Sequence, residues 1–330
     1  MRAIRIEAIG RIAAADVPEP VPGAGEALVE LKAAALNHRD VWIKKGQYAG
    51  LKFPCIPGSD GAGIVTAVGP GADASWVGRE VVINPGFDWG PSEGAQGPGF
   101  SILGMPRDGT LADRVAVPAA QLSPKPPHLT WEEAAALPLS GLTAWRALMA
   151  RARMAKGERV LVTGIGGGGA LFALQFAVAS GNEVWVTSSS DDKIARAVKL
   201  GARGGFRYDR DGWAADAAKS PGPFDVVIDS AGGPGFAGLI DAAAPGGRIA
   251  FFGATRGNAP ELALRKVFWK QLSILGSSMG SPSDWRAMND FVGRHALRPV
   301  VSEVFPFDRA PEAFDHMERG GQFGKIVVRH

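Results

Sequence analysis

Apolar and polar positions change their period near Ser123. Before it, short apolar runs are separated by proline- and glycine-rich turns, at a spacing typical of a compact, barrel-like β domain. The chain opens with apolar residues at Ile4, Ile6 and Ile9, as in a strand with one buried face. Further strands are predicted over residues 26–36, 63–69, 80–83 and 111–118.

After Ser123, strand patterns alternate with helical ones. Thr130 and Glu133 have the spacing of a capping box, which predicts a helix to about Leu137, and a second helix is predicted over 142–154. The alternation that follows predicts βαβ units and a doubly wound parallel sheet. Its expected strands are 160–163, 183–187, 205–207, 224–229, 248–253 and 272–276, and its expected helices are 169–180, 191–200 and 235–244.

Residues 282–330 match the first part of the chain better than the second. We predict there a helix over 283–294, a strand over 304–307, a helix over 310–319 and a strand over 325–329. We therefore expect an α/β domain (124–281) inserted into a β domain (1–123 and 282–330), with the active site in the cleft between them.

A glycine-rich turn stands inside one strand–turn–helix unit. The apolar run Val160–Val162 is typical of a buried parallel strand, and a helix-like apolar run follows the glycines. Gly164-x-Gly166-x-x-Gly169 has the dinucleotide-binding spacing, in which glycines admit a pyrophosphate close to the backbone and a helix N-terminus faces it. A flexible linker would lack these apolar flanks. The predicted backbone contacts are Gly166, Gly167, Gly168 and Gly169.

The end of the second strand indicates which dinucleotide binds. A site selective for NAD places Asp or Glu there, on the ribose 2′-hydroxyl, but this strand ends in Ser188 and Ser189. No carboxylate repels a 2′-phosphate, and the small hydroxyls can donate to it. Asp191 and Asp192 argue the other way, although acidic residues also favour the first turn of a helix. We predict NADPH as the cofactor.

Composition narrows the class of protein. The chain has 330 residues, 46% hydrophobic and 21% charged, which suits two folded domains. The formal charge is +3 without a basic block, so charge gives no reason to expect nucleic-acid binding. We expect no membrane span and no signal peptide, because no apolar stretch is long enough. The single cysteine, Cys55, fits a cytoplasmic protein and is expected to be an inert apolar residue.

Five motifs, in their order, carry a family resemblance. Besides the glycine turn they are Gly58–Val65, Leu137–Trp145, Asp225–Gly233 and Gly324–Val327. Together they resemble the medium-chain dehydrogenase/reductase superfamily, and within it the zinc-free quinone oxidoreductase branch. The resemblance implies a GroES-like β-barrel catalytic domain with an inserted Rossmann-type doubly wound domain.

The resemblance also argues against a metal. It puts Asn37 where zinc-dependent relatives have a catalytic cysteine and Ser59 where they have a ligand histidine. The loop 84–109, where a structural zinc lobe would sit, has no cysteine, and we expect His38 to be an ordinary hydrogen-bonding residue. Without a Lewis acid, alcohol oxidation becomes hard, but hydride delivery to an electron-poor acceptor remains possible.

The resemblance further assigns roles to residues in the site. Asn37, Tyr48 and Thr143 would lie near the nicotinamide or the substrate, with the Tyr48 phenol as a possible donor or else a plain loop aromatic. Lysine and tyrosine at the places of Lys193 and Tyr208 grip a 2′-phosphate in the zinc-free relatives. The loops after the last strands would contact the cofactor through Phe252, Gly253, Ala254 and Ser277.

These expectations favour a zinc-independent, NADPH-dependent oxidoreductase that acts on quinones, α,β-unsaturated carbonyls or similar acceptors. Two alternatives stay open: an NADPH-dependent aldehyde or ketone reductase, and a catalytically weak NADPH-binding protein that regulates a partner or binds nucleic acid. Relatives pair through the last strand of the α/β sheet, here about Leu272 to Leu275, so we expect a homodimer.

Overall fold

The computed structural model describes all residues, Met1 to His330, and they divide into two compact units. The first unit is Met1–Ser140 with Ser281–His330, and the second is Gly141–Gly280. The second unit thus lies between the two segments of the first along the chain. Its start lies after Ser140 and not after residue 123, because helix α2 (Trp131–Ala136) packs on the sheet of the first unit.

The second unit contains a parallel sheet of six strands. Their order is β12-β11-β10-β13-β14-β15, so the direction of winding reverses between β10 and β13. Dinucleotides bind at such a switch point, at the carboxyl ends of the strands. The strands are β10 (Arg159–Val162), β11 (Glu183–Ser188), β12 (Gly204–Arg207), β13 (Phe224–Asp229), β14 (Ala243–Phe251) and β15 (Ser273–Gly276).

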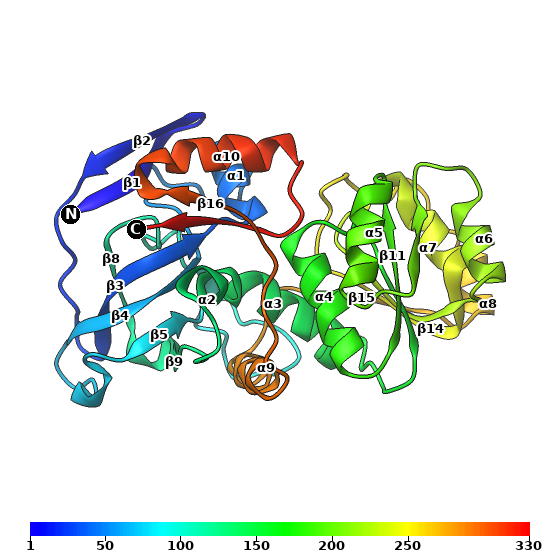
Figure 1. Ribbon diagram of the computed structural model, residues 1–330, viewed down its shortest axis with the longest axis horizontal. Helices are drawn as coiled ribbons and strands as arrows, with labels where there is room; N and C mark the ends of the chain where they lie inside the picture. Colours follow the sequence, from blue (N-terminus) through cyan, green and yellow to red (C-terminus); the bar gives the residue numbers. More distant parts are fainter. The chain divides into compact units, whose positions relative to one another are not determined.

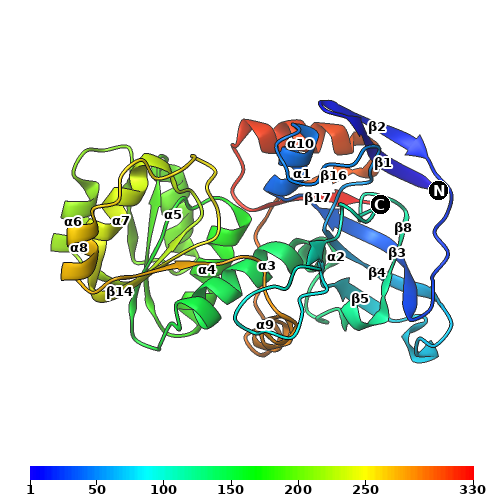
Figure 2. The same cartoon turned by 180° about the vertical axis from the view of Figure 1, so that it is seen from behind.

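Helices cover both faces of this sheet, as Figures 1 and 2 show from opposite sides. Helices α4 and α5 pack on β10 to β12, whereas α7 packs on β14 and contacts α6 and α8. The doubly wound fold is therefore confirmed. The helices are α3 (Pro138–Trp145), which continues as the π-helical η3 (Arg146–Arg151), then α4 (Gly168–Ala179), α5 (Asp191–Lys199), α6 (Trp213–Lys219), the 3₁₀ turn η4 (Gly233–Gly235), α7 (Phe236–Ala242) and α8 (Leu264–Trp269).

The first unit is built on a seven-stranded, mainly antiparallel sheet. Its order is β16-β17-β3-β4-β5-β9, β8 also pairs with β3, and only β16 and β17 are parallel. Because β17 pairs with β3, the last part of the chain completes the sheet begun by the first. Its strands are β3 (Glu26–Ala35), β4 (Asp60–Val68), β5 (Glu80–Ile83), β8 (Arg114–Pro118), β9 (Leu122–Pro124), β16 (Val301–Pro306) and β17 (Lys325–Arg329), and the flanking hairpins are β1 (Arg2–Ala8) with β2 (Arg11–Asp16) and β6 (Gly86–Phe87) with β7 (Ser101–Ile102).

Short helices surround this sheet. Thr130 and Ser281 both form the N-terminal capping boxes of their helices, which fixes where α2 and α9 begin. Helices α1 and α10 pack side by side, visible in Figure 1. The helices not yet given are α1 (His38–Lys44), α9 (Pro282–Arg294), α10 (Ala310–Arg319) and the 3₁₀ turns η1 (Ala74–Trp76), η2 (Ala119–Gln121) and η5 (Phe307–Arg309).

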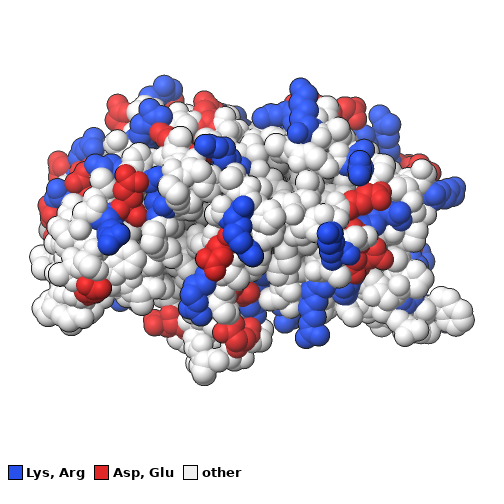
Figure 3. Space-filling model, turned by 60° about the horizontal axis from the view of Figure 1, so that its bottom comes forward, with Lys and Arg blue, Asp and Glu red and all other residues white.

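The face drawn in Figure 3 shows no concentration of one charge. Basic and acidic side chains are interspersed over the face drawn in Figure 3. No helix has both the length and the apolar character needed to cross a membrane.

Candidate functional site

The glycine turn of the second unit has the backbone that only glycine adopts readily. Gly164 and Gly166 have φ values of +62° and +137°, in the region that L side chains avoid. Gly167 is the N-cap of α4, and no side chain caps the helix. The first amides of this 12-residue helix therefore remain open toward an anion at its N-terminus.

Two hydroxyls and a buried carboxylate hold this turn. The Thr187 hydroxyl accepts a hydrogen bond from Gly164 N at 3.1 Å, and the Thr163 hydroxyl donates to Asp229. Asp229 also accepts from Gly232 N at 2.8 Å, and burial raises the pKa of its carboxyl. Asp229 thus caps the turn after β13, as its place at a strand end indicates.

Gly169 makes room for an aromatic ring. A β-carbon at this position would lie 3.0 Å from Cε2 and Cζ of Phe252, closer than carbon atoms normally pack. The Phe252 ring therefore fills the space beside Gly169. This ring comes from the loop after β14 and covers the glycine turn at Gly169.

We expect Gly169→Val to lower the free energy of unfolding by about 1–3 kcal/mol, the usual effect of overpacking. Combined with Phe252→Ala, the same substitution should cost much less, because the ring is gone. Urea denaturation of the two single variants and the double variant measures this coupling. Additive effects would contradict direct packing of residue 169 against Phe252.

The loops after β14 and β15 carry the other predicted cofactor contacts. Gly253 lies so close to Ser230 that a β-carbon would be 2.5 Å from the Ser230 carbonyl oxygen, which explains the glycine. Ala254 is exposed beside it. The Ser277 hydroxyl is buried without a hydrogen-bond partner, at the carboxyl end of β15. An unsatisfied buried hydroxyl is costly, so a bound polar group fits this position.

Ser188, Lys193 and Tyr208 come together at the carboxyl end of β11. Ser188 is buried and accepts from Ser190 N, and its carbonyl accepts from Tyr208 N at 3.2 Å. Ser189 beside it is exposed. The Lys193 backbone is fixed by the Ser190 cap of α5, and burial lowers the pKa of its ammonium, with nearby Arg196 adding to the effect. A desolvated cation of this kind is stabilised by an anion.

The acidic residues that argued against NADPH are partly neutralised. Arg207 forms ion pairs with Asp191 at 2.8 Å and with Asp209 at 2.7 Å, and these carboxylates raise the pKa of its guanidinium. Asp191 is therefore paired on an exposed surface, and Arg207 is committed to two carboxylates.

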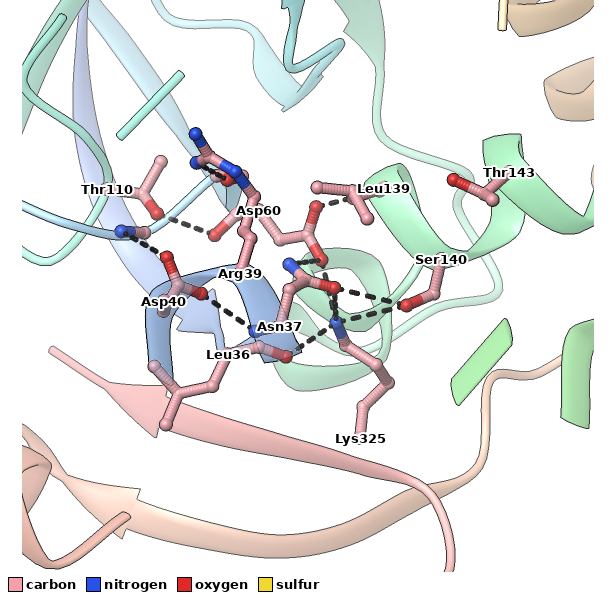
Figure 4. Close-up of polar contacts among 12 residues, drawn as sticks. Leu36, Asn37, Arg39, Asp40, Asp60, Thr110, Leu139, Ser140, Thr143 and Lys325 are labelled. Carbon is pink, nitrogen blue, oxygen red and sulfur yellow. Dashed lines mark hydrogen bonds and ion pairs between the residues drawn. The ribbon is translucent and has the colours of Figure 1, made fainter. Parts of the chain in front are cut away.

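In the first unit, the ammonium of Lys325 lies at the centre of a buried polar cluster (Figure 4). Only 3% of its side chain is exposed. Its Nζ donates to Asp60 Oδ2 at 2.8 Å, Asn37 Oδ1 at 2.6 Å, Leu36 O at 2.8 Å and Ser140 Oγ at 3.4 Å. Buried charges require such complete pairing.

Asn37 is held from both ends of its amide. Its Oδ1 accepts from Lys325 and Ser140, and its Nδ2 donates to Asp60 at 2.9 Å. Its backbone N–H donates to the Asp40 carboxylate, and the two residues form the capping box at the start of α1. Burial raises the pKa of the Asp40 carboxyl. The structure places Asn37 inside a network, where it orients its neighbours.

Arg39 organises the other half of this cluster. It donates to Ser59 Oγ at 2.7 Å and to the carbonyl of Leu103 at 2.7 Å, so it also holds the loop 84–109. Its Nε donates to the Tyr48 hydroxyl at 3.3 Å, and its guanidinium lies 5.0 Å from the centre of the Tyr48 ring. Tyr48 is half-buried, with its own proton free to be donated elsewhere.

Thr143 belongs to the second unit and is buried in α3. Its hydroxyl lies 3.8 Å from the sulfur of Met279, in the same unit. The predicted site residues therefore fall into two sets: Asn37 and Tyr48 in the first unit, and Thr143 with the cofactor residues in the second. Their proposed roles stay predictions.

No group of three or more His, Cys, Asp or Glu side chains has the geometry to hold a metal ion. Cys55 is buried, and burial raises the pKa of its thiol to about 11, so the reactive thiolate is scarce at neutral pH. His38 is exposed, next to Asn37.

Sequence reasoning did not single out Lys325, Asp60 or Ser140 as members of this cluster. One signal was present: Lys325 opens a run of apolar residues predicted to be a strand, and a charged side chain in such a run needs a buried partner. Which partner it takes depends on contacts distant in sequence.

Comparison with known proteins now decides the family. Residues 23–127 match the family described as alcohol dehydrogenase GroES-like domain, and residues 155–294 match the family described as zinc-binding dehydrogenase. The zinc-type alcohol dehydrogenase-like protein YogA of Leptosphaeria maculans is 36% identical over 94% of this chain and 92% of its own length. The chain belongs to the medium-chain dehydrogenase/reductase superfamily.

Other similar proteins of the superfamily carry the names of different oxidoreductases. The quinone oxidoreductase of Rattus norvegicus is 29% identical over 99% of this chain and 97% of its own length. A crystal structure titled NAD-dependent alcohol dehydrogenase is 42% identical, with a TM-score of 0.95 and full coverage of both chains. The protein is therefore an NAD(P)-dependent medium-chain oxidoreductase acting on a small molecule, with a GroES-like and a Rossmann-type domain.

Proposed function

We propose that this protein is a zinc-independent, NADPH-dependent reductase that delivers hydride to a quinone, an α,β-unsaturated carbonyl or a similar electron-poor acceptor. The observation that carries the proposal concerns Asn37 and Ser59, the two positions where zinc-dependent relatives are expected to have ligands. In both, the side-chain oxygen is hydrogen-bonded to a buried cation. Asn37 Oδ1 accepts from the ammonium of Lys325, and Ser59 Oγ accepts from the guanidinium of Arg39.

This arrangement disfavours a divalent cation. A neutral amide and a hydroxyl are weak zinc ligands compared with thiolate and imidazole. Two buried cations beside them would also repel a metal. The Asp60 carboxylate is committed to Lys325, Asn37 and Leu139, and the Asp40 carboxylate to the backbone amides of Asn37 and Gly58, so neither is open to a metal.

The choice of NADPH rests on the end of β11. Ser188 stands where a carboxylate would bind the ribose 2′-hydroxyl of NAD, and Lys193 and Tyr208 lie beside it. The glycine turn at the N-terminus of α4 suits the pyrophosphate. The Ser277 hydroxyl, buried without a hydrogen-bond partner, suits a polar group at the other end of the cofactor. NADPH supplies the hydride when bound.

Hydride addition to an enone or quinone leaves an oxyanion that needs hydrogen-bond donors and then a proton. Tyr48 is the proposed source, because its hydroxyl accepts from Arg39 and keeps its own proton. Asn37 is proposed to position the backbone at the start of α1 and the side chain of Ser140.

Product analysis tests this proposal. We expect an enone to be reduced at its carbon–carbon double bond with NADPH, and a saturated aldehyde of similar size to react at least tenfold more slowly. The reverse order would favour the aldehyde or ketone reductase. Tight NADPH binding with no turnover of either compound would favour a regulatory or nucleic-acid-binding protein.

We also propose that the protein forms a homodimer through the edge of its six-stranded sheet. Strand β15 has β14 on one side only, and α8, close to it in the chain, exposes three large apolar residues. Trp269 is 83% exposed, Phe268 66% and Leu264 64%. An open strand edge beside exposed aromatics requires cover in a stable protein, and a second copy supplies it.

We expect Trp269→Asp to convert the dimer to a monomer at micromolar concentration, because it places a charge in an apolar contact. Size-exclusion chromatography with light scattering gives the mass. Val21→Asp is the matched control, since Val21 is equally exposed but lies in the first unit. A monomeric protein before substitution, or a Trp269→Asp variant that stays dimeric, would contradict this interface.

A further inference from the structure

Arg256 lies in the loop that follows β14, and this loop is fastened to the end of β13. Arg256 N donates to the carbonyl of Ala231 at 2.8 Å, and Gly233 N donates to the carbonyl of Gly257 at 2.8 Å. Two hydrogen bonds of the backbone thus fix the base of the Arg256 side chain.

From this base the side chain extends to a different part of the sheet. Its guanidinium lies 5.1 Å from the centre of the Tyr208 ring, just after β12. In the sheet, β10 and β11 lie between β13 and β12. The side chains of Arg256 and Tyr208 together therefore span the carboxyl ends of the two strands that carry the glycine turn and Ser188.

The guanidinium of Arg256 is available for an anion. It is exposed and has no hydrogen bond or ion pair, whereas Arg207 nearby has two carboxylate partners. Its only side-chain contact of note is with Tyr208, whose backbone N–H binds the carbonyl of Ser188. Arginine binds phosphate through two parallel hydrogen bonds and stacks on aromatic rings. The unpaired guanidinium and its contact with the Tyr208 ring therefore both suit a phosphate-binding role.

We propose that Arg256 binds the 2′-phosphate of the cofactor and sets the selectivity for NADPH, acting together with Lys193 and Tyr208. This inference rests on the proposed use of NADPH. The acidic groups around this point do not oppose it: Asp191 and Asp209 are paired with Arg207, and Asp192 lies near Lys193, which it helps to keep charged.

Calorimetric binding of 2′,5′-ADP and 5′-AMP to the full chain separates the phosphate from the adenosine. We expect Arg256→Ala to weaken 2′,5′-ADP binding about tenfold or more and to change AMP binding less than twofold, the usual range for one charge-assisted contact. Arg256→Lys should retain part of the affinity. Arg203→Ala is the control, because Arg203 is an exposed arginine just before the amino end of β12.

Three other results would overturn the proposed role of Arg256. An equal loss for both ligands would mean that Arg256 stacks on the adenine, and no loss would mean that it only covers Tyr208; either overturns the proposal. If the unaltered protein binds AMP as tightly as 2′,5′-ADP, the proposed use of NADPH fails, and with it the ground for this role of Arg256.

Discussion

Ser188→Asp is expected to raise the dissociation constant for NADPH by roughly 100-fold while leaving that for NADH within about fivefold. A carboxylate there would face the 2′-phosphate, and two like charges about 4 Å apart repel by up to about 4 kcal/mol near a protein surface. With NADH the same carboxylate can accept from the ribose hydroxyl. Fluorescence titration with both cofactors measures the two constants.

The control adds the same charge at the opposite end of the same strand. Asn182 precedes β11, and its side-chain oxygen accepts from Glu158 N, which an aspartate can also do. Asn182→Asp should therefore leave both cofactor affinities unchanged. Equal weakening of NADPH and NADH binding in Ser188→Asp would mean that Ser188 supports the fold and does not select the cofactor.

Lys325→Met is expected to lower the free energy of unfolding of the first unit by about 3–5 kcal/mol, the usual cost of breaking a buried ion pair. The substitution leaves the Asp60 carboxylate buried with no cation. It also removes the hydrogen bonds that Lys325 donates to Asn37 Oδ1 and to the carbonyl of Leu36. Urea denaturation gives the value, provided that the transitions of the two units are fitted separately.

A surface pair in the same unit provides the comparison. Lys32 and Glu30 are both about one third exposed, so Lys32→Met should cost less than about 1 kcal/mol. Asp60→Asn is the reciprocal change: asparagine can still accept from Leu139 N, but it leaves Lys325 buried without a counter-charge, so a cost of similar size is expected. A cost for Lys325→Met no larger than that for Lys32→Met would show that the cluster is not a buried ion pair.

Elements with a strong hydrophobic period were predictable from the sequence. The expected strands at 80–83, 224–229 and 325–329 and the helix at 310–319 coincide with β5, β13, β17 and α10. In each of these elements, burial of one face or of the whole strand produces a regular spacing of apolar residues that can be seen in the sequence.

Short helices left no such pattern. Helices α1, α6 and α8 have six or seven residues each, too few for a helical period to stand out. Strand β14 begins at Ala243 and not at residue 248, and it passes through Pro245 and Gly246, which normally end a strand. Both residues lie where the register with β13 shifts, between the pairs Phe224–Ala243 and Val226–Arg248.

The same distinction applies to the site. The glycine turn and Ser188 could be proposed from the sequence because their predicted role depends on neighbours in sequence, with a strand before and a helix after. Lys325 and Asp60 are 265 positions apart, and Lys325 and Asn37 are 288 apart. The pairing of β17 with β3, and of β3 with β4, places these residues side by side although they are far apart in the sequence, so no local motif predicts their contact. Arg256 was missed for the same reason.

The most direct test of the proposed function is the rate of cofactor oxidation by the metal-stripped protein with a quinone or an enone as acceptor. After exhaustive chelation, with zinc content checked by elemental analysis, we expect full activity and at least a tenfold higher kcat/KM with NADPH than with NADH. Loss of activity that zinc restores, or turnover confined to an alcohol and NAD⁺, would contradict the account.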